Sequence, residues 1–191
     1  MDEARAGDAS EAAVRTLLTE IGEDAERAGL LGTPERVSRM YQELTSGYRT
    51  DPDGLINGAC YEVDYDEMVV VRDIEFYSLC EHHLLPFFGR VHVGYLPRGT
   101  VIGLSKIPRI VEMYAKRLQL QERMTTEVAE FLMERLNAKG VGCVVEASHL
   151  CTMMRGVKKE EARMVTSSML GTFRRDGRTR NEFLRLIGKT L

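Results

Sequence analysis

The sequence has little that would tie it to a specialised class of protein. Its 191 residues include four cysteines and no tryptophan, and 26 basic residues nearly balance 29 acidic ones for a net charge of −3. Four cysteines are too few for a disulfide scaffold, and a near-neutral charge argues against a general nucleic-acid binder. No apolar run approaches the roughly 18 residues of a membrane span, and residues 1–10 lack the basic and apolar regions of a secretory signal. We therefore expect a cytoplasmic protein that binds neither membranes nor nucleic acid.

The rest of the composition is that of an ordinary globular chain, with 43% hydrophobic and 29% charged residues. Apolar spacing and turn residues predict helices at about 10–21, 33–44, 105–117, 121–137 and 179–187, and strands at 68–76, 91–95, 141–147 and 163–173. Ser10, Thr33 and Thr179 are predicted as helix caps. Because strands and helices come in pairs and do not alternate, we predict an α+β fold with an antiparallel sheet.

The densest group of potential metal ligands is the segment C-E-H-H at 80–83. Cys80 and His83 lie three residues apart, a spacing that lets a thiolate and an imidazole meet one metal across a turn. A second group, H-L-C at 149–151, ends the strand predicted from Val141. If the alternation of that strand stays regular, its histidine and cysteine point to the same side of the sheet.

Together, Cys80, His83 and Cys151 predict a Cys₂His group, which leaves the fourth position of a tetrahedral zinc open, as a hydrolytic site needs. His82 and His149 would then stand beside the metal without binding it. That is where acid and base groups acting on a bound water belong.

A closed structural zinc site is the alternative, with Cys60 or Cys143 as a fourth ligand. Each of these two cysteines is also typical of a small buried hydrophobic residue. Spacing alone favours the open site but leaves both arrangements possible.

Basic residues mark a possible anion site at the start of the helix that begins near Ser105. Lys106 and Arg109 lie three residues apart in its first turn, where free N–H groups and the helix dipole attract anions. Other cations that could hold phosphate groups are Arg36, Arg39 and Arg155. No G-x-x-x-x-G-K-[ST] segment occurs, which excludes a P-loop. Gln121 and Glu122 begin the next helix, where position alone indicates no more than an ordinary N-terminal charge.

Taken together, these segments resemble the GTP cyclohydrolase I family. The matching segments, in family order, are TPERV (33–37), DEMV (66–69), SLCEHHLLPF (78–87), GLSKIPRIV (103–111), RLQLQERMT (117–125), HLCTMMRGV (149–157) and TSSMLGTFR (166–174). The resemblance implies a T-fold, in which an antiparallel four-stranded sheet carries a helical pair and subunits join their sheets into a barrel. It also implies a homodecamer of two pentamers with active sites between subunits. On this basis we divide the chain into an N-terminal helical region, 1–60, and a T-fold catalytic domain, 61–191.

The resemblance further implies the reaction, which converts GTP and water into 7,8-dihydroneopterin triphosphate and formate as the first step of folate and pterin biosynthesis. It assigns one Zn²⁺ per subunit to Cys80, His83 and Cys151. The implied catalytic residues are His82, His149 and Ser105, and the implied substrate-binding residues are Arg36, Lys106, Arg109, Gln121, Glu122 and Arg155.

The family chemistry gives these residues separate tasks. His149 protonates N7 of guanine as the ring opens, His82 assists proton transfer, and Ser105 shuttles a proton during the later rearrangement. Glu122 accepts hydrogen bonds from the Watson–Crick edge of guanine, Gln121 lines the pocket, and the basic residues hold the triphosphate.

Two rival classes share the fold. A catalytically silent binding module could lose His149 or a metal ligand, and this chain keeps both. Another T-fold enzyme, such as a pterin synthase or a nitrile reductase, would need a different metal triad or nucleophile.

Overall fold

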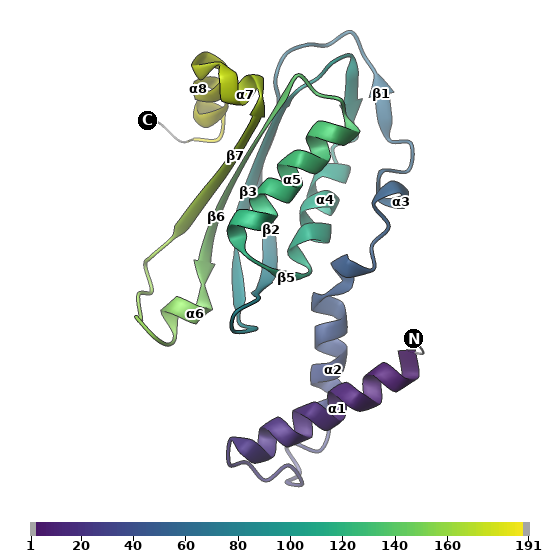
Figure 1. Cartoon of the computed structure of the whole chain (residues 1–191), viewed down its shortest axis with the longest axis vertical. Coiled ribbons are helices and arrows are strands. Elements are labelled where there is room, and N and C mark those ends of the chain that lie inside the picture. The colour runs from purple at the N-terminus through teal and green to yellow at the C-terminus, as the bar shows by residue number, and fades with distance from the viewer. Residues whose placement is uncertain (1–2, 189–191) are drawn as a thin grey trace. The chain divides into compact units, whose positions relative to one another are not determined.

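The computed structural model describes residues 3–188 and separates into two units, Met1–Ser46 and Gly47–Leu191. The first unit contains two helices that pack on each other, α1 (Glu3–Glu20) and α2 (Thr33–Leu44) (Figure 1). Residues 47–60, which the sequence-based division assigned to the helical region, here contribute the end of η1 (Ser46–Tyr48), α3 (Pro52–Ile56) and the start of β1 to the second unit.

The start of α1 differs from the prediction. Ser10 lies inside this helix and is not its cap, and its hydroxyl instead shares a hydrogen bond with the Ser38 hydroxyl of α2. The preceding segment, 3–9, contains three alanines, and alanine is the strongest helix former, so the helix extends through it. The predicted start of α2 near Thr33 is confirmed, with Pro34 in its first turn, but the N-cap residue is Gly32 and the predicted cap Thr33 lies inside the helix.

The second unit is built on a five-stranded sheet in the order β5-β2-β3-β6-β7. Its four long strands are antiparallel neighbours: β2 (Val69–Cys80), β3 (Pro86–Leu96), β6 (Gly140–His149) and β7 (Met164–Gly171). The fifth, β5 (Leu118–Gln119), pairs in parallel with the end of β2, and β1 (Cys60–Glu62) pairs separately with β4 (Thr100–Ile102). This confirms the predicted α+β fold and its antiparallel sheet. The three short strands were not predicted, because they are too short to show a periodic pattern.

One face of the sheet is covered by α4 (Lys106–Ala115) and α5 (Gln121–Arg135), as Figure 1 shows. Alternate side chains of the central strands point into this layer and are at most 1% exposed: Val91, Val93 and Tyr95 from β3, and Val141, Cys143, Val145 and Ala147 from β6. The helices complete the core with the equally buried Ile110, Val111, Val128 and Leu132. Among the described helices, none has both the length and the apolar character needed to cross a membrane.

The opposite face is covered at one end by α7 (Thr172–Arg175) and α8 (Gly177–Leu186). Phe173 and Phe183 are fully buried there and pack against two glycines of the sheet. The cap of α8 also differs from the prediction. Asp176 is the cap, accepting hydrogen bonds from the backbone N–H groups of Arg178 and Thr179, so Thr179 itself lies inside the helix.

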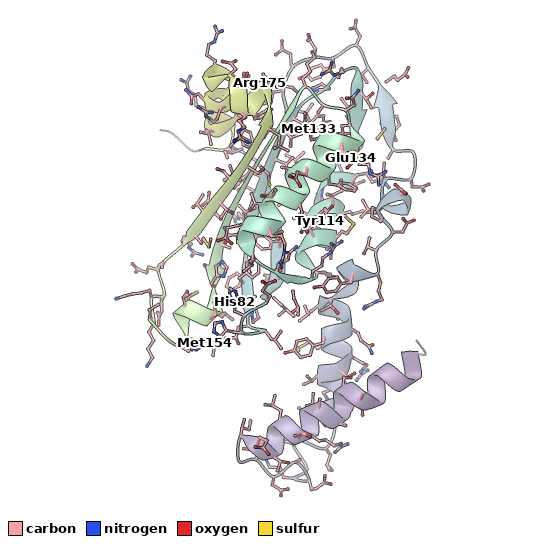
Figure 2. All side chains as sticks on the ribbon, viewed as in Figure 1. His82, Tyr114, Met133, Glu134, Met154 and Arg175 are labelled. Atoms are coloured by element: carbon pink, nitrogen blue, oxygen red, sulfur yellow. The ribbon has the colours of Figure 1, made fainter. Side chains whose placement is uncertain are left out.

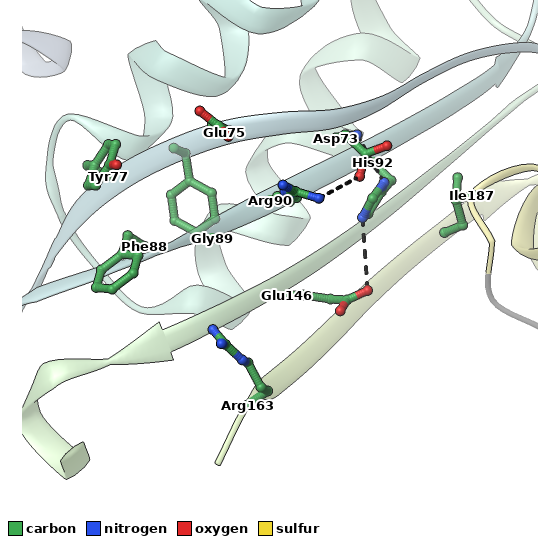
Figure 3. A pocket seen from close by; sticks show the side chains of 11 residues that line it. Asp73, Glu75, Tyr77, Phe88, Gly89, Arg90, His92, Glu146, Arg163 and Ile187 are labelled. Carbon is green, nitrogen blue, oxygen red and sulfur yellow. Dashed lines mark hydrogen bonds and ion pairs between the residues drawn. The ribbon is translucent and has the colours of Figure 1, made fainter. Parts of the chain in front are cut away.

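The rest of this face forms a shallow hollow of about 430 Å³ (Figure 3). Two pairs of polar side chains lie in it: Arg90 Nη1 is 3.4 Å from Asp73 Oδ1, and His92 Nε2 is 3.9 Å from the Glu146 carboxylate. Within the described chain, none of the site residues predicted from the sequence lines this hollow.

Candidate functional site

The three predicted metal ligands come together at one end of the sheet, which we call the metal end. Cys80 is the last residue of β2, His83 lies in the turn that leads to β3, and Cys151 lies in α6 (Leu150–Met153). One ligand atom from each residue lies within 4.8 Å of the others, and no other such group of three occurs in the described part of the chain. Zinc–sulfur bonds of about 2.3 Å and zinc–nitrogen bonds of about 2.0 Å place tetrahedral ligands roughly 3.5–3.8 Å apart. Small side-chain movements therefore suffice for this set to hold one ion.

A tight turn brings His83 back toward Cys80. The Cys80 carbonyl accepts hydrogen bonds from the N–H groups of His83 (3.3 Å) and Leu84 (2.8 Å), and Leu84 adopts a left-handed conformation with φ of 54°. The Cys80 N–H in turn donates to the Leu85 carbonyl at 2.9 Å. Hydrogen bonds between backbone groups of residues 80–85 therefore hold this segment, here called the ligand turn, in its conformation.

Cys151 reaches the group by a different route from the one predicted. β6 ends at His149, and the chain then turns into the short helix α6, so strand alternation does not carry Cys151 to the site. Both His149 and Cys151 lie at the metal end, but the regular strand expected through Cys151 is replaced by a helical turn after His149.

The four cysteines fall into two groups, two inside the ligand group and two outside it. Cys143 is fully buried in the core, where burial raises the pKa of its thiol to about 12. Cys60 lies in β1, and neither it nor Cys143 belongs to the ligand group in the described structure. The Cys151 thiol has a raised pKa because of burial first and the neighbouring Cys80 second. The group is therefore Cys₂His, with no fourth cysteine among the described residues to close it.

His149 is held beside the ligand group in a defined orientation. Its ring stacks on Phe87, with centroids 4.6 Å apart and planes 3° from parallel, and its Nε2 lies 2.8 Å from Gln121 Oε1. Burial lowers its pKa, while the nearby Glu122 carboxylate opposes that shift. Burial is the larger effect, so His149 favours the neutral form near pH 7, and Glu122 lies close enough to influence it.

Gln121 determines which nitrogen of His149 carries a proton. The Gln121 side chain is buried, and its Nε2 donates to the carbonyl oxygens of Val145 (3.1 Å) and Met164 (3.0 Å). Carbonyl oxygens can only accept, so the amide oxygen must face His149. His149 therefore donates through Nε2 and keeps the lone pair on Nδ1. We predicted that Gln121 lines the substrate pocket. In the structure its side chain forms hydrogen bonds with His149 and with two backbone carbonyl groups of the sheet.

The remaining residues of the metal end are more exposed. Arg155 Nη1 lies 2.8 Å from His83 Nε2, and because a guanidinium can only donate, the imidazole nitrogen accepts. His82 is exposed, with its ring 6.2 Å from that of His83. Figure 2 shows His82 at the same end of the sheet as Met154, which directly follows α6.

The predicted phosphate-binding residues of α4 lie in its first turn, outside the ligand group. Ser105 is exposed at the N-cap without a capping hydrogen bond from its side chain, and Arg109 is exposed one turn further on. Lys106 donates from Nζ to the Leu55 carbonyl at the end of α3 (2.7 Å). Arg36 and Arg39 belong to α2 in the other unit, where Arg39 pairs with Glu35 at 3.5 Å.

Strand register shows how far the start of α4 is from the metal end. The N–H of Ile102, just before α4, donates to the Tyr95 hydroxyl, and Tyr95 pairs with Val69 at the beginning of β2. Cys80 ends the same strand, eleven residues later. At about 1.5 Å per residue, the ten residues of α4 span roughly 15 Å before the chain reaches Gln119, which pairs with Cys80. One chain therefore keeps the start of α4 apart from the ligand group.

Phe87 also lies at the metal end, although it was not predicted as a site residue. It belongs to the segment that carries the resemblance, but its stacking under His149 follows from the pairing of the two residues across β3 and β6. Nothing in the local sequence indicates that register.

An α+β fold that carries an open Cys₂His group beside an oriented imidazole defines a class, the candidate metal-dependent hydrolases. Comparison with known proteins narrows that class. The family model described as GTP cyclohydrolase I matches residues 10–188. The chain belongs to the GTP cyclohydrolase I family, which confirms the resemblance.

Individual relatives agree over nearly the whole chain. It is 58% identical to GTP cyclohydrolase 1 of Methylococcus capsulatus over 173 residues, which is 91% of this chain and 94% of that one. It is 60% identical to GTP cyclohydrolase 1 of Synechococcus sp. (strain JA-3-3Ab) over 176 residues, 92% of this chain and 77% of that one. Among solved structures, the archaeosine synthase QueF-Like in the apo form matches with a TM-score of 0.42 and 21% identity, covering 55% of this chain and 96% of that one.

Proposed function

We propose that this chain catalyses the zinc-dependent conversion of GTP and water into 7,8-dihydroneopterin triphosphate and formate, the first step of folate and pterin biosynthesis. The observation that carries the proposal is the meeting of Cys80, His83 and Cys151 within 4.8 Å, beside a histidine whose orientation a buried glutamine fixes. Membership of the family supplies the substrate and the reaction.

Cys80, His83 and Cys151 would hold one Zn²⁺ per subunit, and the two thiols and one imidazole are the donor types that zinc prefers. A bound zinc supplies Lewis acidity, which lowers the pKa of water toward ~7.

His149 moves a proton at Nδ1, because its Nε2 is committed to Gln121. Its lowered pKa leaves Nδ1 unprotonated near neutral pH. It can therefore take a proton from the water that attacks C8 of guanine and pass it to N7 as the ring opens. His82, exposed in the ligand turn, assists proton transfer at the same end of the site.

Guanine recognition falls to Glu122 in the first turn of α5. Its carboxylate lies near enough to His149 to influence the pKa of that imidazole, so a base bound by Glu122 sits within reach of the proton donor. A carboxylate accepts hydrogen bonds from the N–H groups on the Watson–Crick edge of guanine, which adenine does not present in that pattern. Arg155, beside His83, would contact the triphosphate.

The rest of the substrate site comes from another subunit in this proposal. Lys106 and Arg109 would hold the triphosphate, with Arg36 assisting, and the uncapped Ser105 hydroxyl would shuttle a proton during the rearrangement. The separation of α4 from the ligand group supports a shared site. The two edges of the sheet also support a shared site. β7 is the outermost strand at one edge, and at the other edge β5 pairs with only two residues of β2, so a strand of another chain can pair at either edge. We propose that sheets join through these edges into the T-fold barrel of a homodecamer made of two pentamers.

The test is incubation of the zinc-loaded protein with GTP. Formate should appear, and oxidation of the product should give neopterin fluorescence, whereas ATP should give neither. Absence of formate from protein shown to contain one zinc per chain would refute the proposal.

A further inference from the structure

Arg123, the third residue of α5, reaches out of its helix to the ligand turn. Its Nη2 donates to the Glu81 carboxylate and to the Leu118 carbonyl (3.1 Å), and its Nε donates to Gln119 Oε1 (2.9 Å). Glu81 is the residue between the proposed ligand Cys80 and the two histidines that follow. Neither Arg123 nor Glu81 has a part in the proposed chemistry.

A buried glutamine fixes the position of the Arg123 guanidinium. Gln119 is 1% exposed, and its Nε2 donates to the Tyr114 carbonyl (3.0 Å) and to Glu127 Oε2 (2.7 Å). These acceptors turn the Gln119 amide oxygen toward Arg123. The guanidinium is thus oriented by the protein interior before it meets Glu81.

Glu81 is fixed twice, through its side chain and through its backbone. Its carboxylate pairs with Arg123, and its N–H donates to the Gln119 carbonyl at 3.1 Å. The next three residues of the turn, His82, His83 and Leu84, are all exposed. The contacts of Glu81 therefore connect an otherwise exposed turn to β5 and α5.

We propose that Arg123 and Glu81 are positioning residues, which hold the ligand turn so that Cys80 and His83 can bind one ion; this inference rests on the proposed zinc function. If the turn occupies the binding geometry for a smaller fraction of the time, the apparent metal affinity falls by that fraction. Arginine suits the position because its planar guanidinium donates in several fixed directions at once, which a lysine ammonium on a flexible stem does not.

The experiment compares Glu81→Gln and Arg123→Gln with a matched control, Arg135→Gln. Arg135 lies at the other end of α5 and forms its own ion pair with Asp53 at 2.6 Å. Zinc dissociation constants are measured at 25 °C by competition with a chromophoric chelator, and metal-free thermal unfolding is recorded for each protein. We expect both variants of the pair to bind zinc about tenfold more weakly, at the low end of the effect of residues that support metal ligands. The control should bind zinc as the unsubstituted chain does.

The zinc constant separates positioning from simple stabilisation. An ion pair that only stabilises the fold would lower the metal-free unfolding temperature and leave the zinc constant of the folded protein unchanged, and that result would overturn the inference. If Arg123→Gln does not fold, Glu81→Gln decides alone, because it keeps the Arg123–Gln119 contact and replaces only the charge. Failure of the proposed site is distinguishable, since zinc binding by the unsubstituted chain would then be absent or would survive Cys151→Ala.

Discussion

The metal end of the sheet and the start of α4 hold their polar residues in different ways. At the metal end, side chains fix one another: Gln121 contacts His149, Arg155 contacts His83, and Arg123 contacts Glu81. At the start of α4, Ser105 and Arg109 are exposed, and Lys106 contacts a backbone carbonyl. One region is organised within the chain, whereas the other presents its groups outward.

This difference indicates what each region needs from outside. The proposed metal binding and proton transfer depend on positions that must be correct within fractions of an ångström, and contacts within the chain fix those side chains. Phosphate binding by flexible cations needs charge more than precise geometry. The start of α4 can therefore serve a site that another subunit completes.

Loss of a ligand should have the largest effect. Cys151→Ala should lose zinc and turnover together, because two remaining ligands hold zinc poorly. Metal analysis and formate release measure both. Cys60→Ala, which changes a cysteine outside the ligand group, is the control and should keep both. Zinc bound at full stoichiometry by Cys151→Ala would contradict the assignment.

His149→Ala should separate metal binding from proton transfer at the same end. It should keep zinc but lose turnover by about 10²–10⁴-fold, the usual contribution of an acid–base group. Zinc content and the rate of formate release are compared in one preparation. Normal hydrolysis of GTP by this variant would remove His149 from the mechanism.

Glu122→Ala should weaken GTP binding by about ten- to a hundredfold, since hydrogen bonds to a charged group contribute roughly 1.5–3 kcal/mol. Zinc affinity should stay unchanged, because Glu122 does not belong to the ligand group. Equilibrium binding of GTP under conditions that prevent turnover measures the effect. An unchanged GTP affinity would exclude Glu122 from the guanine site.

Mixed oligomers test whether the two regions meet between chains. Cys151→Ala chains co-produced in equal amounts with Lys106→Ala/Arg109→Ala chains should recover about a quarter of normal activity, since a heterologous interface pairs two intact regions at one site in four. Co-production of Cys151→Ala with His149→Ala is the control and should recover nothing, because both changes affect the metal end. Equal recovery in the two mixtures would argue against a shared site.

A change on the face of the sheet opposite α4, and away from the metal end, should leave turnover alone. A Cβ at Gly142 would lie 2.6 Å from the Phe173 ring, so Gly142→Ala should lower the free energy of unfolding by about 1–3 kcal/mol through overpacking. Gly177→Ala, with its nearest neighbour 3.9 Å away, is the matched control. Thermal unfolding and activity per zinc are measured for both, and a turnover defect in folded Gly142→Ala would connect α7 and α8 to the site.

Local sequence patterns predicted the structure correctly where all the residues of a pattern lie in one helix, strand or turn. The long strands and helices follow from apolar periodicity, and the C-x-x-H spacing placed Cys80 and His83 on one turn. These patterns failed at Ser10 and Thr179, where neighbouring residues extended a helix or supplied the cap. They also failed at Cys151, whose approach to the site depends on α6, a single helical turn too short to leave a periodic pattern.

The sequence by itself determined which chemistry this protein can perform, because thiol, imidazole and carboxylate groups are properties of single residues and their spacing. Only the tertiary structure decided how that chemistry is oriented. The proton on His149 Nε2, the ring of Phe87 beneath it and the contact of Arg123 with Glu81 all join residues distant in the chain. The path of α4 across the sheet also keeps its first turn apart from the ligand group. Such relations arise from strand pairing and packing, which no local pattern encodes.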